Sequence, residues 1–178
     1  MSIAHRFTKG EIEDWANRYI SRAKKREWEA EENIEQVVSP SVRKNRSCSR
    51  SEFLALCDWK TPRTRQQCER NEEGFIREVT SIAFTTPNER LRIEVLTLLE
   101  GVNWPTASVL LHFGHVDPYP ILDFRALESL SIVKPPTYEF SFWWKYVQRC
   151  RQIASDCNIP MRTLDRALWA YSKFKRRR

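Results

Sequence analysis

Apolar residues along this chain recur at intervals of three and four positions rather than alternating. That spacing places side chains on one face of an α-helix, whereas a half-exposed strand alternates apolar and polar residues. With only four glycines and few β-branched alternating runs, no sheet is expected. We therefore predict an all-α helical bundle in which residues 1–178 form a single compact domain. The predicted helices cover residues 8–36, 49–59, 71–84, 87–99, 105–113, 123–130, 138–157 and 162–174.

Local signals locate several helix ends in the N-terminal half. Thr8-x-x-Glu11 and Ser49-x-x-Glu52 are capping boxes that each predict a helix start. The charged residues 24–36 are expected to continue the first helix on its solvent side. Pro40 and the basic run around it predict a linker, so residues 1–47 are expected to form an N-terminal helical segment followed by a basic linker.

Two later predictions concern which side chains face inward and what caps the next helix. In the 71–84 segment the expected inward face consists of Phe75, Ile76, Val79, Ile82 and Ala83. Thr86-Pro87-x-Glu89 is expected to cap the helix that follows. The aromatic residues of segment 138–157 cannot all lie on one side of a helix, so we expect some to pack against other elements or to line a cleft.

The net charge of +7 is unevenly distributed. Residues 41–70 carry eight Lys/Arg against three Asp/Glu, and a basic tail at residues 173–178 carries five basic residues and no acid. Clustered positive charge suits a polyanion and predicts double-stranded DNA as partner, although a solvated basic surface is the alternative. No apolar run long enough to span a bilayer and no signal peptide is apparent, which favours a monomeric cytoplasmic or nucleoid-associated protein without membrane contact.

Residues 96–125 contain most of the candidate chemistry. An apolar helical run stops at Gly101, the corner Gly101-Val102-Asn103-Trp104 follows, and Pro105 opens a second apolar run. Glycine takes the positive φ that closes a helix, asparagine is the next best residue for a left-handed corner, and proline suits a first helical turn. The pattern predicts a helix, a hairpin and a helix, with outward backbone amides that suit a phosphate.

The pattern Leu99-x-Gly101-Val102-x-x-x-Thr106-Ala107, followed by Asp123, resembles the helix-hairpin-helix DNA glycosylase superfamily, which includes endonuclease III and 3-methyladenine glycosylases. The resemblance covers about Leu98 to Asp123. It implies that Asp123 is the catalytic carboxylate for base excision and that the hairpin holds the DNA backbone, through Gly101, Val102, Asn103, Trp104 and Thr106.

The same resemblance narrows the expected reaction. Pro105 stands where bifunctional members carry the lysine that forms a Schiff base, which implies a monofunctional enzyme that does not cleave the strand. Three positions depart from the family pattern. Glu100 replaces a usual proline, Asn103 replaces the second hairpin glycine, and Glu128 falls where arginine is common. An acidic residue beside a phosphate site weakens anion binding.

Asp123 has a second reading, because aspartate before a helix is a preferred N-cap. Both roles are compatible. If capping is the only one, the chain is a non-catalytic helix-hairpin-helix DNA-binding module instead of an enzyme.

Other side chains are candidates for a base pocket or for contacts to the DNA backbone. One group places an aromatic side chain beside cations and consists of Trp59, Lys60 and Arg63. This arrangement suits stacking on a base, and it equally suits a packed tryptophan with a polar rim. Lys60 is also a candidate Schiff-base amine. Tyr119, between two prolines near Asp123, is the preferred pocket residue.

Metal and cofactor sites are not expected. His112-x-x-His115-x-Asp117 has ligand-type residues but straddles a helix end and lacks a fourth ligand. Cys150 and Cys157 show the spacing that opens an iron-sulfur motif, but Pro160 and Arg166 stand where further ligands are needed. All five cysteines, an odd number without a C-x-x-C pair, are expected to be reduced core residues. The expected cofactor content is therefore none.

Overall fold

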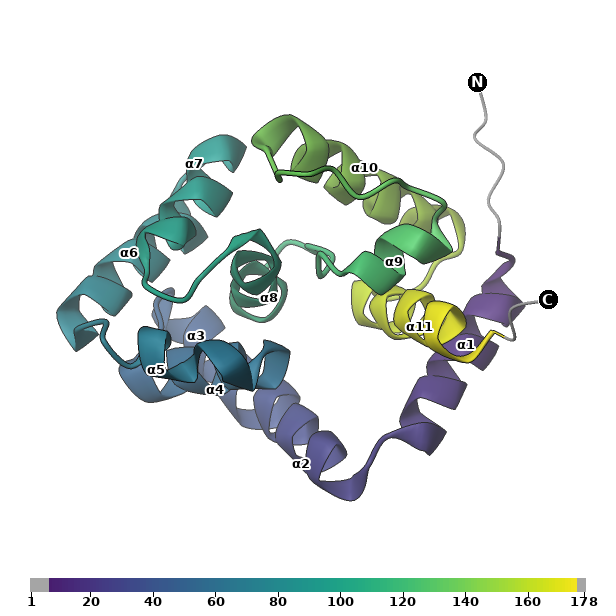
Figure 1. Ribbon diagram of the computed structural model, residues 1–178, viewed down its shortest axis with the longest axis horizontal. Coiled ribbons are helices and arrows are strands. Elements are labelled where there is room, and N and C mark those ends of the chain that lie inside the picture. The colour runs from purple at the N-terminus through teal and green to yellow at the C-terminus, as the bar shows by residue number, and fades with distance from the viewer. Residues whose placement is uncertain (1–6, 176–178) are drawn as a thin grey trace. The chain divides into compact units, whose positions relative to one another are not determined.

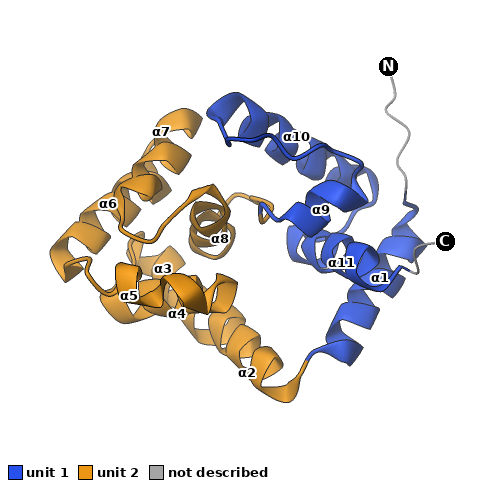
Figure 2. Ribbon diagram, viewed as in Figure 1, with its two compact units in different colours: residues 1–23, 122–178 blue, residues 24–121 orange. Residues whose placement is uncertain are grey.

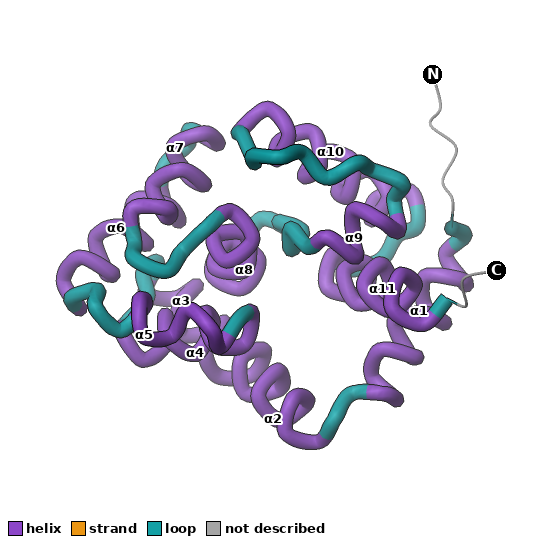
Figure 3. Tube along the Cα trace, viewed as in Figure 1, coloured by secondary structure: helices purple, strands orange, loops and turns teal. Residues whose placement is uncertain are grey.

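All regular secondary structure in residues 7–175, the part of the chain that the computed structural model describes, is helical (Figures 1 and 3). This confirms the all-α prediction for these residues. The chain divides into two compact units (Figure 2). Unit 1 consists of Met1–Ala23 and Leu122–Arg178, and unit 2 of Lys24–Ile121. Each unit has its own core, and the prediction that residues 1–178 act as one domain stays a prediction.

In the described part of unit 1 there are four helices, of which α1 and α11 pack along each other. They are α1 (Lys9–Arg22), α9 (Phe124–Ser129), α10 (Phe140–Asp156) and α11 (Met161–Phe174). The predicted capping box is present, since Thr8 Oγ1 accepts from the Glu11 amide at 3.3 Å and Glu11 Oε2 accepts from the Thr8 amide at 2.8 Å. Ile12 of α1 and Leu164 and Leu168 of α11 are buried in this core.

The aromatic residues of α10 divide between the core and the surface, which confirms that they do not share one side. Trp143 and Tyr146 are buried, whereas Phe140 and Trp144 are half-buried and stack with ring centroids 6.3 Å apart. Cys150 is a buried core residue as expected, but Cys157 forms the C-cap of α10 and is half-buried. Of the predicted basic tail, residues 173–175 are described, and residues 176–178 lie outside the described residues.

Unit 2 is built around α8 (Trp104–Gly114), whose residues 106–114 are all buried. Helices α3, α4, α6 and α7 all contact α8. In chain order, the elements before α8 are α2 (Lys25–Asn33), the π-helix η1 (Ile34–Val38), α3 (Ser39–Asn45), α4 (Arg50–Lys60), the 3₁₀-helix η2 (Pro62–Thr64), α5 (Arg65–Cys68), α6 (Glu73–Thr85), α7 (Glu89–Glu94) and the 3₁₀-helix η3 (Val95–Leu98).

The predicted linker around Pro40 is wrong, because α2, η1 and α3 follow one another without a break. Within η1 the helix widens, and the Ser39 amide donates to the Ile34 carbonyl five residues back. Pro40 then occupies the first turn of α3, where its fixed φ suits a helix and its missing amide costs little. Ser39 Oγ also donates to the Phe113 carbonyl at 2.6 Å, which anchors this segment to the C-terminal end of α8.

The first two helices are separate, which corrects the expectation of one continuous helix through residue 36. Ala23 and Lys24 are both extended, with ψ of 138° and 146°. The break coincides with the boundary between the two units. Charge periodicity alone carries no signal for such a break, because residues on both sides favour a helix.

The inward face of α6 differs from the prediction. Ile76, Val79 and Ala83 are buried as expected, but Phe75 and Ile82 are 43% and 37% exposed. Thr80 and Phe84 fill the buried face in their place. The prediction of Thr86 as cap is also wrong, because Asn88 caps α7 by accepting hydrogen bonds from the amides of residues 90 and 91 at 3.0 Å.

Candidate functional site

Gly101 forms the predicted left-handed corner between η3 and α8, with φ of 80°. The Val102 amide donates to the Leu99 carbonyl at 3.1 Å and closes the turn. A Cβ atom on Gly101 would lie 2.7 Å from Cys68 Sγ and 3.0 Å from the Cys68 backbone nitrogen. Both the backbone angle and the close approach to α5 therefore require glycine here.

Asn103 does not adopt the left-handed corner that the sequence suggested. Its φ of −108° and ψ of 177° are extended, and it is the N-cap of α8. Asn103 Oδ1 accepts from the Thr106 amide and from Thr106 Oγ1, both at 3.2 Å. Trp104 is consequently the first residue of α8 and Pro105 the second, a position that tolerates proline.

The five predicted hairpin residues differ in their access to solvent. Asn103 is exposed, Gly101 and Trp104 are half-buried, and Val102 and Thr106 are buried. Within residues 7–175, the backbone amides of Gly101 and Asn103 have no hydrogen-bond acceptor. The corner thus presents two adjacent donors to an anion, while Val102 and Thr106 support its backbone.

Asn71 holds the hairpin in place, and sequence reasoning did not identify it as a site residue. Its Nδ2 donates to the carbonyls of Glu100 and Cys68, both at 2.9 Å, and its Oδ1 accepts from the Glu100 amide at 2.8 Å. The side chain is buried. No local signal could reveal this clamp, since Glu100 lies 29 residues away in the sequence.

The Glu100 side chain is less unfavourable to an anion than the sequence suggests. Its Oε2 atom lies 3.5 Å from Arg70 Nη1 in an ion pair between two exposed side chains. The Arg70 guanidinium offsets part of the negative charge next to the corner. An exposed pair of this kind contributes little to stability, so its main effect is on the local potential.

Two thiols lie below the corner and are both fully buried, as expected for core cysteines. Cys57 on α4 and Cys68 on α5 share a hydrogen bond, which lowers the pKa of Cys68 to about 7. The same bond, together with burial, raises the pKa of Cys57 far above its ordinary range. The hydrogen bond therefore favours ionisation of Cys68 over ionisation of Cys57.

Asp123 is the N-cap of α9 in unit 1, which confirms the capping role. It is half-buried, its backbone is extended, and its Oδ1 accepts from the Arg125 amide at 2.9 Å. Burial raises the pKa of Tyr138 and of Tyr146, and the negative charge of Asp123 raises both further. The carboxylate thus lies within electrostatic reach of two phenols that stay protonated at neutral pH. Its catalytic role stays a prediction.

Asp165 is a second acidic residue of this region that sequence reasoning missed. It is buried on α11, with 6% of its surface exposed, and its charge raises the pKa of both Tyr146 and Cys150, after burial itself. The sequence did contain a signal. Asp165 directly follows Leu164 on the apolar face of an otherwise amphipathic helix, a position that few carboxylates occupy.

Tyr119, the predicted pocket residue, is fully buried in the core. Its hydroxyl donates to Glu89 Oε2 at 2.7 Å, and its carbonyl lies 2.6 Å from His112 Nδ1. The ring packs edge-to-face with His115 at 5.2 Å. These contacts give Tyr119 a structural role as a link between α7 and α8, and its pocket role stays a prediction.

The histidines of the considered metal motif contact other protein groups. His115 Nε2 lies 2.6 Å from Arg92 Nη1, and His115 Nδ1 accepts from the Asp117 amide at 2.9 Å. No group of three or more His, Cys, Asp or Glu side chains in the described part of the chain is arranged to hold a metal ion.

Some arginines of the predicted basic segment are held by neighbouring groups. Arg65 pairs with Asp58 and with Glu69, whose Oε1 lies 2.8 Å from Arg65 Nε. Arg43 Nε donates to the Phe113 carbonyl at 3.1 Å, at the C-terminal end of α8. Arginines held in this way have fewer N–H donors left for a phosphate.

Of the three candidates at the end of α4, only Arg63 is exposed. Trp59 is half-buried and packs edge-to-face on Phe113, with ring centroids 5.4 Å apart. This contact is the packed-tryptophan arrangement that was the alternative to base stacking. Lys60 is half-buried.

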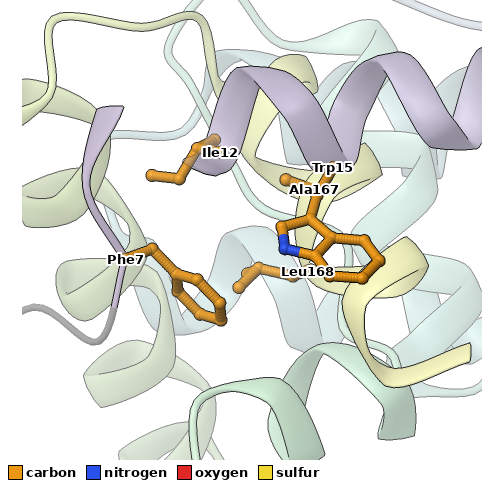
Figure 4. Close-up of a pocket in the computed structure, with 5 residues that line it drawn as sticks. All are labelled: Phe7, Ile12, Trp15, Ala167 and Leu168. Atoms are coloured by element: carbon orange, nitrogen blue, oxygen red, sulfur yellow. The ribbon is translucent and has the colours of Figure 1, made fainter. Parts of the chain in front are cut away.

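A small apolar hollow lies between α1 and α11 in unit 1 (Figure 4). It is lined by Phe7, Ile12, Trp15, Ala167 and Leu168 and has no room for a water molecule. It is therefore a packing defect and not a pocket for a base.

No helix in residues 7–175 combines the length and the apolar character needed to cross a bilayer. Comparisons with protein-family models, with curated proteins and with solved structures each gave no match. The family resemblance of residues 98–123 therefore stays a prediction, and the geometry around Gly101 and Asp123 is the basis for any functional proposal.

Proposed function

We propose that this chain binds double-stranded DNA through the Gly101–Trp104 corner and hydrolyses the N-glycosidic bond of a damaged or modified base with Asp123. The observation that carries the proposal is the position of Asp123, a half-buried carboxylate at the N-terminus of α9. Burial raises the pKa values of Tyr138 and Tyr146, so both neighbouring phenols are neutral at neutral pH.

The hairpin supports the DNA-binding part of the proposal. A phosphate oxygen accepts hydrogen bonds from backbone amides, and the amides of Gly101 and Asn103 have no acceptor within residues 7–175. The clamp from Asn71 fixes the backbone of the preceding residue, so these donors are held in place before a ligand arrives. Fixed donors bind an anion with less loss of entropy.

Asp123 supplies what base excision requires. The bond between C1′ of the sugar and the base nitrogen breaks, its electron pair leaves with the base, and positive charge develops on the sugar ring. A carboxylate stabilises that charge. Water then forms the new bond to C1′, and Asp123 accepts the proton that water loses. The hydrogen bond from the Arg125 amide holds the carboxylate in place before the reaction.

Hydrolysis without strand cleavage is proposed because Pro105, the second residue of α8, stands where the resemblance places the Schiff-base lysine of bifunctional members. Pro105 has no amine with which to attack C1′. The proposed enzyme is therefore monofunctional and leaves an abasic site in an intact strand. A monomer in the cytoplasm or nucleoid, without membrane contact, is part of the same proposal.

The test uses duplexes that carry uracil, hypoxanthine, 8-oxoguanine or an alkylated purine. Excision is scored as strand breakage after hot alkali, and the expected result is breakage with at least one duplex. The key variant is Asp123→Asn, because asparagine caps a helix as well as aspartate and only the charge is lost. Asp123→Asn should abolish excision while the protein stays folded and still binds duplex DNA. Strand breakage without alkali would contradict the monofunctional mechanism.

A second function, a non-catalytic DNA-binding module, is favoured by one observation. The corner at Gly101 and its clamp involve only unit 2, and they do not depend on Asp123. If no duplex is cut after alkali, while Gly101→Ala reduces duplex binding and Asp123→Asn does not, the binding module is correct and the enzyme is not.

A further inference from the structure

We propose that unit 1 carries a separate binding surface for single-stranded nucleic acid, formed by α1 and α11 with Arg125 of α9 and called here the α1–α11 face. The proposal concerns side chains outside the hairpin and independent of Asp123. It rests on two groups of aromatic rings, each with cations beside it, and on the absence of salt bridges to these cations among residues 7–175.

Half-buried aromatic rings form two groups on this face. Trp15 of α1 packs edge-to-face with Tyr171 of α11, with ring centroids 5.3 Å apart. Tyr19 packs in the same way with Trp169 at 5.2 Å, and Trp169 with Phe174 at 6.0 Å. Trp15 also borders the apolar hollow between the two helices (Figure 4).

Exposed cations accompany each group of rings. The Arg18 guanidinium lies 4.3 Å from the Trp15 centroid, and the Lys173 ammonium lies 4.2 Å from the Trp169 centroid. Arg22 lies 4.7 Å from Phe174, and Lys175 lies 4.6 Å from Tyr171. Trp15, Arg18, Tyr19 and Arg22 follow the spacing of a single helix face, so the alternation runs along α1.

These cations have no acidic partners in the described structure. Within residues 7–175, no salt bridge is formed by the five cations of this face, which are Arg18, Arg22, Arg125, Lys173 and Lys175. In unit 2, by contrast, ion pairs hold Arg65, Arg70, Arg77, Arg90 and Arg92. The cations of the α1–α11 face therefore have no acidic partner among residues 7–175, whereas Arg65 and Arg70 of the basic segment 41–70 are paired.

The charge distribution along the sequence agrees with this difference. Residues 24–121, which form unit 2, contain 14 Lys/Arg and 15 Asp/Glu, a net charge of −1. The rest of the chain contains 16 Lys/Arg and 8 Asp/Glu, a net charge of +8. The positive charge of the protein thus belongs to the chain segments of unit 1.

Single-stranded nucleic acid is the partner that fits both features. Its phosphates pair with cations and release counterions, and its unstacked bases offer flat faces to aromatic rings. A duplex offers the same phosphates, but its base faces are hidden in the stack, so the rings would contribute nothing. DNA and RNA share this chemistry, and both belong in the test.

The test measures fluorescence anisotropy of labelled oligothymidylate and oligouridylate of about 20 nucleotides with the full chain, over a range of salt concentrations. Arg18→Ala combined with Lys173→Ala should lower the slope of log affinity against log salt by about 1.4, at about 0.7 for each lost phosphate contact on a single strand. The matched control is Arg65→Ala combined with Arg90→Ala, which removes two arginines held in ion pairs and should leave the slope unchanged.

A second pair of variants tests stacking. Trp169→Leu should weaken single-strand binding by about 5- to 150-fold, whereas Trp169→Tyr keeps an aromatic face and should retain most of the affinity. Circular dichroism checks that both variants are folded. The proposal is overturned if Arg18→Ala with Lys173→Ala leaves the salt slope unchanged, or if Trp169→Leu and Trp169→Tyr bind equally.

Two further outcomes also contradict the proposal. The first is binding to vesicles of phosphatidylserine without binding to either oligonucleotide, which would assign the face to an anionic membrane surface. The second is equal loss of affinity in the Arg65→Ala, Arg90→Ala control. Base excision from duplexes is scored separately in the same variants, so failure of this proposal and failure of the proposed enzyme are distinguishable.

Discussion

Replacing Gly101 with alanine tests the corner on which the DNA-binding proposal depends. The φ of 80° costs a residue with a Cβ atom about 1–2 kcal/mol. The new methyl group would also lie 2.7 Å from Cys68 Sγ and 3.1 Å from Gln67 Cβ, and such overpacking costs about 1–3 kcal/mol. Gly101→Ala should therefore lower the free energy of unfolding by about 2–5 kcal/mol, a large part of the stability of an ordinary domain.

The measurement is urea unfolding followed by tryptophan fluorescence. Gly74→Ala is the matched control, because no atom lies within 4 Å of the added Cβ and the position is in the first turn of α6. There the same substitution should leave the stability unchanged or raise it by up to about 1 kcal/mol. If Gly101→Ala is as stable as Gly74→Ala, neither the strained φ nor the contact with Cys68 is real.

A double variant separates the two causes. Cys68→Ala removes the sulfur atom closest to the new methyl group, but it leaves the φ of residue 101 and the Cys68 backbone nitrogen at 3.0 Å. In the Cys68→Ala background, Gly101→Ala should therefore cost less than in the wild type, by an interaction free energy of about 0.5–3 kcal/mol. Identical costs in both backgrounds would show that the contact with Cys68 Sγ contributes nothing, and would leave the backbone angle and the remaining close contacts as the cause.

Three further predictions concern single side chains. Asn71→Leu leaves the partly buried backbone groups of Glu100 without partners and should destabilise the protein by about 1–3 kcal/mol, measured by urea unfolding. Duplex affinity should fall as well, and an unchanged affinity would show that the clamp does not hold the corner. The hydrogen bond from the Thr8 amide lowers the pKa of Glu11 below its ordinary value of 4.5. The ionised Glu11 therefore stabilises the fold at pH values above 4.5, and this contribution is lost as the pH falls through the lowered pKa. Glu11→Gln should reduce stability near neutral pH but not at about pH 3. Asp123→Ala removes a helix cap and should cost about 0.5–2 kcal/mol by thermal unfolding, whereas Asp123→Asn should cost almost nothing; equal losses would show that the carboxylate charge, and not the cap, stabilises α9.

Features that depend on neighbouring residues could be predicted from the sequence. The capping boxes at Thr8 and Ser49 join residues three positions apart, and both are present. The positive φ of Gly101 and the capping role of Asp123 follow from the conformational preferences of single residues. The hairpin between two helices was therefore predictable, together with the all-α class.

Features that depend on distant residues could not be predicted in this way. Pro40 is a reliable loop signal in isolation, yet here it lies in a helix that Ser39 ties to Phe113, 74 residues further along the chain. The side chain of Asn71 acts on Glu100 across 29 residues. Periodicity identifies a helix but not which neighbour covers it, which explains the exchange of Phe75 for Thr80 on the buried face of α6.

The charge of the basic segment also depends on distant residues, and this bears on the proposed DNA binding. A count of charges between residues 41 and 70 predicts a phosphate-binding surface, but the ion pairs of Arg65 and Arg70 reduce the positive charge of that surface. Unit 2 as a whole carries a net charge of −1. The two amides at the Gly101 corner can position a phosphate, but they supply no net charge to attract one. Long-range attraction must then come from the cations of unit 1, which carries the remaining +8. Positioning and attraction are therefore assigned to different parts of the chain.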